Sequence, residues 1–385
     1  MSDTLTHPQP AKPLRGGFST GAYLTATAVA ACHAYLGLPY VSKLKIQFAD
    51  GVVRAINVDG ARLHGDASAE AWSIKDAGED VDATNGLRLT SQVNFAVDPS
   101  QSFEARAEDF VETLGAVRFI LRGGSGVGLV SRDGLDVPRG KVAINPTPRR
   151  MLWTNLAALD LGPVREVLIE LNIERGAEVA RRTLNPKLGI ENGLSVLGTT
   201  GLVIPCSHAA YIATIELMVR GVYRLGGDSV SLVTGGRSHR WLKTRYPDAE
   251  EAAIVRFGDF IRESLECCAQ YHMSEVRVVC MVGKLAKYAL GIPNTHAKKV
   301  EQSPEKVAEL LQRLGYAEDL TAATDDCRSV RELLSRLAPE QQLRVIGLLR
   351  DEAVQQLSRW AGGAHLQIHV LDTTGEREIL CESNG

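Results

Sequence analysis

The sequence lacks the patterns that mark several common classes of protein. No apolar run approaches the roughly 20 residues of a membrane-spanning helix, so we expect no membrane partner. The net charge is −3, and nothing in the composition favours nucleic acid as a partner. Residues 1–13 include an acidic residue and no apolar core, so we expect a disordered arm there and not a secretory signal. Together these features predict a cytoplasmic protein.

Cysteine and histidine are present, but without the spacings that disulfide frameworks or metal sites require. The seven cysteines are an odd number with no C-x-x-C pair, which is typical of reduced thiols in the cytosol. Cys267 and Cys268 are adjacent on an expected helix, where packing is the simpler role. The nine histidines form no H-x-x-x-H pair and no cluster with cysteine. We therefore predict that the protein itself binds no metal.

Glycine, by contrast, is abundant and clustered. The chain has 36 glycines in 385 residues, above the usual share of about 7%. With Ser and Thr they form four loops: LNPKLGIENGLSVLGTTG at 184–201, GGFSTG at 16–21, GGSGVG at 123–128 and TGGRSH at 234–239. Glycine lets the backbone turn or approach a ligand closely, and N–H groups beside hydroxyls can grip an anion or cofactor. Four such loops predict a ligand site assembled from distant segments, although close-packed turns explain each loop taken singly.

Alternation and helical spacing predict helices and strands along the whole chain. Residues 22–34 are apolar on every face, which predicts a buried helix with Ser19 or Thr20 at its N-cap. Alternation over Leu44–Phe48, followed by Asp50-Gly51, predicts a hairpin with a two-residue turn. Further strands are expected at 117–121, 164–173, 229–233 and 276–281. Helices are expected at 177–183, after Ser207, after Ser303-Pro304 and at 340–360.

These elements predict a mixed α/β fold in several parts. Three prolines are expected to keep 137–149 extended or turned. We expect a glycine-loop-rich N-terminal α/β domain at 14–200 and a second α/β domain at 201–300. Residues 301–385 are expected to form a helical tail that closes with a β-hairpin of 366–371 and 378–381. No internal repeat or low-complexity linker is present.

Three further segments carry side chains suited to chemistry, each with a plainer alternative. Asn145–Arg150 ends in two guanidinium groups, which suit bidentate carboxylate binding but also form ordinary surface ion pairs. Lys75–Asp80 places three acids and one base around a glycine, as a solvated turn also does. Asn294–His296 carries a histidine, a residue type that titrates near neutrality but is more often structural in a loop. The loop at 123–128 is no Walker A loop, because no Lys-Ser/Thr follows its last glycine.

Taken together and in order, the motifs resemble those of one family. The matching stretches, from about residue 14 to 300, are LRGGFSTGAYLTATAVAA, SIKDAGEDVDATNG, GGSGVGLVSRDGLDVPRGKVAINPTPRRM, RRTLNPKLGIENGLSVLGTTGLVIP, VTGGRSH and VGKLAKYALGIPNTHAKK. The chain is identified as a member of the cobalt-precorrin-5B C-1-methyltransferase family of anaerobic cobalamin biosynthesis. It departs from the family pattern at Glu191-Asn192, at Cys206–His208 and at Thr295–Ala297, which is compatible with a paralogue of shifted specificity.

The resemblance implies methyl transfer from S-adenosylmethionine to C-1 of cobalt-precorrin-5B, giving cobalt-precorrin-6A. Cobalt then enters only as part of the tetrapyrrole substrate. A sulfonium is already a good leaving group, so such a displacement needs mainly positioning by the protein. That agrees with a sequence that has no Ser/His/Asp triad and many glycine–hydroxyl loops. A homo-oligomer is compatible with the sequence.

Roles follow for the residues in the family-like loops. The donor is expected at loops on strand or helix junctions: Thr199, Thr200, Gly201, Thr234, Gly235 and Gly236. The tetrapyrrole and its carboxylates are expected at glycine loops and nearby cations: Ser19, Thr20, Gly21, Gly124, Gly126, Asn145, Arg149, Arg150, Arg181, Arg182, Lys187, Arg237, Lys284, Lys287 and Thr295. Asp76 or His296 would remove a proton if the reaction requires it.

Two other functions are compatible with the same loops. GGFSTG before an alanine-rich helix is similar to the phosphate loop of small-metabolite kinases, although no acidic metal pair is evident at a useful spacing. A tetrapyrrole-binding protein without catalytic activity would need the same acceptor loops. Nucleotide binding with magnesium would favour the kinase, and bound pigment without turnover would favour the carrier.

Overall fold

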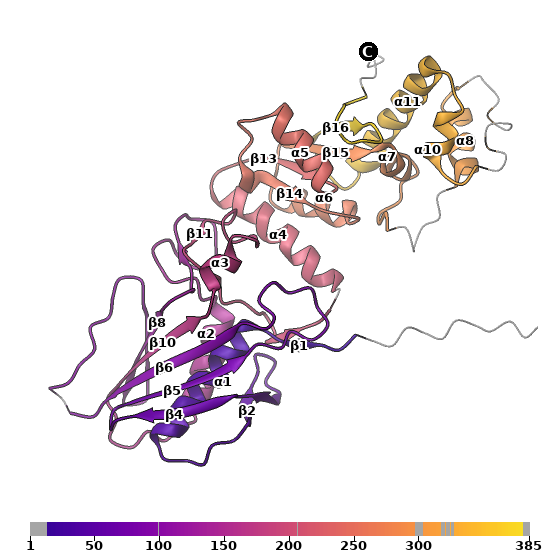
Figure 1. The fold of residues 1–385 in the computed structure, drawn as a ribbon. Helices are drawn as coiled ribbons and strands as arrows, with labels where there is room; N and C mark the ends of the chain where they lie inside the picture. The colour runs from indigo at the N-terminus through magenta and orange to yellow at the C-terminus, as the bar shows by residue number, and fades with distance from the viewer. Residues whose placement is uncertain are drawn as a thin grey trace, which may run out of the picture. The chain divides into compact units, whose positions relative to one another are not determined.

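The computed structural model describes residues 14–98, 100–205, 207–296, 303–316, 320, 324 and 327–379 (Figure 1). The predicted arm at 1–13, together with Cys206, Ala297 and the last residues of the predicted hairpin, lies outside the described residues. The chain divides into two compact units, Met1–Ser207 and His208–Gly385. We call them unit 1 and unit 2.

A six-stranded sheet forms the centre of unit 1, in the order β4-β5-β6-β10-β8-β7. Its strands are β4 (Gly60–His64), β5 (Ser68–Ile74), β6 (Arg88–Ala96), β7 (Phe110–Leu114), β8 (Val117–Gly123) and β10 (Glu166–Ile173). The β8–β10 pair is parallel and the other pairs are antiparallel. Side chains of β10 alternate between buried and partly exposed, as expected for a strand with one face on the core.

Helix α1 (Thr20–Tyr35) is the central helix of unit 1 and packs on β5, β6 and the helix α2 (Pro146–Leu156). Every residue of α1 from Thr20 to Cys32 is buried, so a helix that is apolar on all faces fits this position. Ser19 is its N-cap, and the Ser19 Oγ accepts from Ala22 N at 3.3 Å. The predictions of the helix, of its N-cap and of strands β8 and β10 are confirmed.

Short pairs of strands hold the loops of unit 1. They are β1 (Gly17–Phe18) with β12 (Leu202–Val203), β9 (Leu129–Val130) with β11 (Ile190–Glu191), and β2 (Lys43–Gln47) with β3 (Val53–Asn57). Helix α3 (Gly176–Ala180) follows β10, in the predicted place.

Two local predictions in unit 1 are wrong. The β2–β3 hairpin exists, but Phe48 N donates to Val52 O, so three residues form its loop, and of these only Gly51 has a positive φ. A two-residue primed turn at Asp50-Gly51 would require a positive φ at Asp50, whether it were of type I′ or II′. Residues 146–149 are helical because Pro146 occupies the first turn of α2, where a missing N–H breaks no hydrogen bond.

Unit 2 is built on a four-stranded parallel sheet in the order β14-β13-β15-β16. Its elements are α4 (His208–Arg224), β13 (Ser229–Val233), α5 (Gly236–Arg245), the 3₁₀ turn η1 (Glu251–Ala253), β14 (Ile254–Arg256), α6 (Ile261–Gln270), β15 (Glu275–Met281), α7 (Val282–Ala289), α8 (Pro304–Arg313), α10 (Val330–Ser335), α11 (Pro339–Ser358) and β16 (His365–Leu371). The predicted strands β13 and β15 and the N-cap Ser303 of α8 are confirmed.

The domain boundaries expected from the sequence, at residues 200 and 300, differ from the two units of the structure, whose boundary along the chain is at Ser207. Strand β16 lies far beyond residue 300, yet it pairs in parallel with β15. A parallel pair needs a long crossover, and helices α8, α10 and α11 lie along that connection. The chain does turn back after β16, with Asp372 N donating to Arg377 O at 2.9 Å, but the main partner of β16 is β15. Among the described residues, no helix is long and apolar enough to cross a membrane.

Gly126 provides a direct test of close backbone packing in unit 1. Its φ is +79°, and a Cβ there would overlap Ile173 O, whereas Gly65 has φ +61° and open space around it. Left-handed strain costs about 1–2 kcal/mol at either position, and overpacking adds about 1–3 kcal/mol. We expect Gly126→Ala to lower the free energy of unfolding by about 3 kcal/mol and Gly65→Ala by about 1 kcal/mol. Urea unfolding of both variants measures this difference, and equal losses would contradict the packing argument.

Candidate functional site

The predicted site residues fall into both units. Unit 1 contains Ser19, Thr20, Gly21, Asp76, Gly124, Gly126, Asn145, Arg149, Arg150, Arg181, Arg182, Lys187, Thr199, Thr200 and Gly201. Unit 2 contains Thr234, Gly235, Gly236, Arg237, Lys284, Lys287, Thr295 and His296. The two loops predicted to hold the donor therefore belong to different units.

In unit 1, distant segments meet at the first turn of α1. Ser19 N donates to Gly201 O at 2.9 Å, and Gly21 N donates to Leu197 O at 3.3 Å. Phe18 N donates to Asp76 O at 3.0 Å. The structure thus places the Ser19–Gly21 loop beside the 197–201 loop, although the sequence analysis assigned these loops to different ligands.

The same hydrogen bonds decide what the GGFSTG loop can bind. A phosphate loop must present free backbone N–H groups to the anion. Here the N–H groups of Phe18, Ser19 and Gly21 already donate to backbone carbonyls. A Cβ on Gly17 would overlap the Ala77 backbone, so glycine is required there for contact between two chain segments. These contacts argue against a kinase-like phosphate site at this loop.

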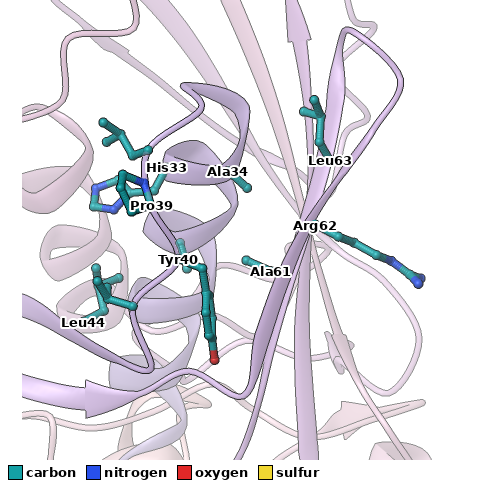
Figure 2. Close-up of a pocket in the computed structure, with 11 residues that line it drawn as sticks. His33, Ala34, Pro39, Tyr40, Leu44, Ala61, Arg62 and Leu63 are labelled. Atoms are coloured by element: carbon teal, nitrogen blue, oxygen red, sulfur yellow. The ribbon is translucent and has the colours of Figure 1, made fainter.

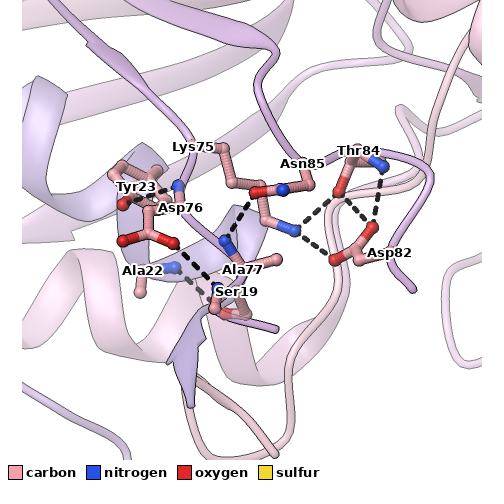
Figure 3. A network of polar contacts seen from close by, with 10 residues as sticks. Ser19, Ala22, Tyr23, Lys75, Asp76, Ala77, Asp82, Thr84 and Asn85 are labelled. Carbon is pink, nitrogen blue, oxygen red and sulfur yellow. Dashed lines mark hydrogen bonds and ion pairs between the residues drawn. The ribbon is translucent and has the colours of Figure 1, made fainter. Parts of the chain in front are cut away.

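Asp76 lies beside the first turn of α1, in the network of Figure 3. Its backbone N–H donates to Tyr23 Oη at 3.0 Å. Its carboxylate makes a bidentate pair with Arg15, at 2.6 and 2.9 Å, and accepts from Gly78 N at 2.8 Å. The hydrogen bonds from Arg15 lower the pKa of Asp76. Asp76 is therefore held ionised and oriented, which makes it a weak base.

The neighbouring Lys75 is a buried lysine that holds the following loop. Its side chain is 1% exposed, and its Nζ donates to Asp82 and, at 2.6 Å, to Thr84 Oγ1 (Figure 3). Burial lowers the pKa of Lys75, and the charge of Asp82 opposes that shift. Ala77 N also donates to Asn85 Oδ1 at 2.9 Å, so both ends of the 76–85 loop are fixed.

The GGSGVG loop packs against backbone on two sides. Gly124 N donates to Leu171 O and Gly128 N donates to Leu194 O, at 2.8 and 2.9 Å. Ser125 N donates to Asn172 Oδ1 at 2.7 Å. Since these N–H groups are engaged, the loop acts first as a packing element. The facing segment contains Asn192 at φ +63°, a left-handed position that asparagine tolerates better than most residues.

Several cations predicted to bind the substrate have partners within the protein. Arg149 lies 3.8 Å from the centre of the Phe110 ring and donates to Ile144 O at 3.1 Å. Arg237 donates to Thr373 O at 3.2 Å, and Lys287 donates to Thr295 O at 2.8 Å. Four of the predicted arginines are exposed: Arg150, Arg181, Arg182 and Arg237.

In unit 2, several loops meet at the carboxyl edge of the parallel sheet. Strand β13 leads into Thr234–Gly236 and then into α5, and β15 leads directly into α7. From β13 the chain passes to β14 on one side, and from β14 it crosses to β15 on the other side of β13. Ligands of open α/β sheets bind at such a switch point, outside the carboxyl ends of the strands.

Gly235 and Gly236 differ from the glycines of unit 1. A Cβ on Gly235 would meet nothing within 4 Å, and on Gly236 only Arg240 Nη1 at 3.9 Å. Packing within the described residues therefore does not require glycine at either position. Ser238 Oγ accepts from Gly235 N at 2.9 Å and orders the loop, and the first-turn N–H groups of α5 follow. This open loop is suited to close approach by a ligand.

A polar cluster adjoins this loop, and the sequence analysis missed its central residue, Asp259. Asp259 Oδ1 lies 3.2 Å from Lys284 Nζ and accepts from Thr295 Oγ1 at 2.9 Å. Burial raises the pKa of Asp259, but the charge of Lys284 and the hydrogen bonds from Thr295 and Lys284 lower it, so the net shift is downward. The charge of the nearby His296 lowers it further. The signal available in the sequence was a Gly-Asp pair shortly after Ile254-Val255, but β14 has only three residues and shows no periodicity.

No metal site is evident in the part of the chain that the structure describes, since no group of three or more His, Cys, Asp or Glu side chains is arranged around a common point. The described cysteines are free and buried: Cys32, Cys267, Cys268, Cys280 and Cys327. Burial raises the pKa of Cys32, Cys267 and Cys280 to about 12, so these thiols are poor nucleophiles near neutral pH.

Figure 2 shows a small apolar cavity in unit 1, formed by the last turns of α1, residues 38–41 and the edge strand β4. It lies at the other end of α1 from Ser19. Its volume is about 160 Å³, below the roughly 300–1,000 Å³ of sites for drug-sized ligands. None of the glycine loops lines it, and it is too small for a tetrapyrrole.

Asp82→Asn tests whether the Lys75–Asp82 pair holds unit 1 together. The change leaves a buried ammonium without its counter-charge, so we expect the free energy of unfolding to fall by about 3 kcal/mol near neutral pH. Because burial lowers the folded-state pKa of Lys75 below its ordinary 10.5, the variant should regain stability as pH rises toward that value. Urea unfolding at several pH values measures both effects. Asp66→Asn, at an exposed turn, should change stability by less than about 0.5 kcal/mol, and equal losses in the two variants would contradict this account.

Two family models match separate parts of the chain, and the first ends close to the end of unit 1. A family model described as CbiD matches residues 7–205, and one described as CbiD, C-terminal domain, matches residues 294–384. A cobalt-precorrin-5B C(1)-methyltransferase of Geobacillus sp. (strain WCH70) is 32% identical over 354 residues, which are 91% of this chain and 92% of that protein. The protein of that name from Dechloromonas aromatica (strain RCB) is 33% identical over 381 residues, 96% of this chain and 91% of that protein.

A solved structure, described as a cobalamin biosynthesis protein (cbiD) from Archaeoglobus fulgidus, is 23% identical and covers 71% of this chain and 79% of that chain, with a TM-score of 0.37. The identity over nearly the full length of the curated relatives, together with the two family models, confirms the family that the glycine-rich motifs indicate. The chain belongs to the CbiD family.

Proposed function

We propose that this protein transfers a methyl group from S-adenosylmethionine to C-1 of cobalt-precorrin-5B, giving cobalt-precorrin-6A. One observation carries the proposal: relatives that match more than nine-tenths of the chain are named cobalt-precorrin-5B C(1)-methyltransferase. The methyl donor is our inference from the reaction, since a methyltransferase needs a donor and the sulfonium of S-adenosylmethionine is a good leaving group.

We place the donor at the open loop of unit 2, Thr234–Gly236. The loop lies at the switch point of a parallel sheet, and its glycines leave room for close approach by a nucleoside or an amino acid. The positive end of the α5 dipole favours the carboxylate of the donor's methionine part. The predicted donor contact at Thr199–Gly201 has weaker support, because Gly201 is buried against Phe48 and Met151.

The acceptor carries many acetate and propionate groups. We assign to them the exposed guanidinium groups of Arg150, Arg181 and Arg182, which can form bidentate pairs with carboxylates. Arg149 instead supports the site, because it is fixed between Phe110 and Ile144 O. The Ser19–Gly21 and 123–128 loops shape unit 1 through backbone packing.

The reaction on this proposal is an in-line displacement. The electron pair of the ring carbon forms the new bond to the methyl carbon as the methyl–sulfur bond breaks. The electrons of the broken methyl–sulfur bond remain on sulfur, and S-adenosylhomocysteine leaves. Holding two reactants in line can contribute about 7–11 kcal/mol, so the protein needs no nucleophile of its own.

If a proton leaves the ring, His296 is the better of the two predicted bases. Asp76 is paired with Arg15, and a carboxylate stabilised in this way binds a proton weakly. His296 lies near the Asp259 carboxylate, and no arginine is among the groups that act on that carboxylate. We assign Asp76 to positioning the first turn of α1.

Anaerobic incubation with cobalt-precorrin-5B and methyl-labelled S-adenosylmethionine tests the proposal. We expect the tetrapyrrole to gain one labelled methyl group, with one S-adenosylhomocysteine formed per product, as followed by mass spectrometry. Samples without donor or without protein are the controls. Binding of the pigment without turnover would contradict the proposal and indicate a carrier, and phosphorylation of a metabolite with ATP and magnesium would indicate a kinase.

A further inference from the structure

Asp259, the acidic residue that follows β14, lies next to the open loop of unit 2, Thr234–Gly236. Val233 and Arg256 are paired in register, and Phe257 N donates to Val233 O at 3.1 Å. The residues just beyond these strands, Thr234–Gly236 and Phe257–Asp259, therefore leave the sheet side by side. An acid about 20 residues after a glycine loop, at the end of the adjacent strand, accepts hydrogen bonds from ribose hydroxyls in dinucleotide-binding folds.

Among the described residues, contacts are made to only one oxygen of the Asp259 carboxylate. Lys284 Nζ and Thr295 Oγ1 both contact Oδ1, at 3.2 and 2.9 Å. Within the described parts of the chain, Oδ2 has no hydrogen-bond donor, and the side chain is 31% exposed. Lys284 also donates to Gly258 O, so the lysine is fixed by two oxygens and holds the carboxylate in one orientation. An oriented carboxylate with a free oxygen is an acceptor for a hydroxyl group.

A second polar group near Asp259 also lacks a partner. The Tyr288 hydroxyl is fully buried on α7 and has no hydrogen-bond partner among the described residues. Burial raises the pKa of Tyr288, and the nearby charges of Cys280 and Asp259 raise it further. Buried hydroxyls in native proteins are nearly always hydrogen-bonded, so the Tyr288 hydroxyl is a polar position available for a further hydrogen bond near Asp259.

We infer that Asp259 binds the ribose of the methyl donor, with Oδ2 accepting a hydrogen bond from one of its hydroxyl groups. This inference rests on the proposed function, in which the donor is S-adenosylmethionine bound at Thr234–Gly236. An anionic acceptor at this position selects a nucleoside with free 2′ and 3′ hydroxyls and repels one that carries a 2′-phosphate. Asp259 is thus a specificity-determining residue for the donor.

The test measures binding of S-adenosylhomocysteine by calorimetry to the full chain and to Asp259→Asn. The amide keeps an oxygen for Thr295 and replaces the free carboxylate oxygen with an N–H donor. Since a hydrogen bond to a charged group contributes about 1.5–3 kcal/mol, we expect Kd to rise about 10- to 100-fold. Asp228→Asn is the matched control at the opposite edge of the sheet, where Asp228 Oδ2 accepts from Ser274, and its Kd should equal that of the unmodified chain.

A ligand analogue lacking the 2′ and 3′ hydroxyls separates ribose binding from a structural role. The unmodified chain should bind this analogue as weakly as Asp259→Asn binds S-adenosylhomocysteine. Asp259→Asn should bind the analogue with the same Kd as the unmodified chain does. Equal binding of both ligands to the unmodified chain would overturn the inference without reference to any variant. So would an equal loss for both ligands in Asp259→Asn. If S-adenosylhomocysteine does not bind the unmodified chain, the donor assignment in the proposed function fails, and the inference fails with it.

Discussion

Close contact between backbone segments is the constraint on which the structure of unit 1 depends. Gly17 meets the Ala77 backbone and Gly126 meets Ile173 O at positions where a Cβ would overlap the facing chain. The Gly17 contact brings distant segments to the first turn of α1, and several N–H groups of both glycine loops donate to carbonyls of the protein. The charged groups around them, Lys75–Asp82 and Arg15–Asp76, fix the loop that follows β5.

Glycine has a different role at the carboxyl edge of unit 2. Gly235 and Gly236 have open space where a Cβ would be, and the oriented Asp259 carboxylate lies on the adjacent strand connection. The same residue type thus serves chain packing in one unit and ligand access in the other. On this account, unit 1 supplies a rigid frame with exposed arginines for an anionic macrocycle, and unit 2 supplies the donor site. In the function that we propose, the reactants carry the chemistry, and the protein positions them.

The sequence allows prediction of those parts that a local pattern determines. The apolar faces of α1, the alternation of β10 and the runs of β13 and β15 are such patterns. The pairing of β16 with β15 depends on a long crossover that no local pattern reveals. Asp259 was missed because β14 is too short to show a period. The family resemblance predicts which loops matter, but only the structure separates glycines that pack from glycines that leave space.

A crystal structure with bound S-adenosylhomocysteine tests the central claim, that the donor site belongs to the open loop of unit 2, most directly. The account predicts density for the amino-acid part at Gly235 and Gly236 and for the ribose within hydrogen-bond distance of Asp259 Oδ2. Density for the nucleoside at Ser19–Gly21 and Thr199–Gly201, with the 234–236 loop unoccupied, would contradict it.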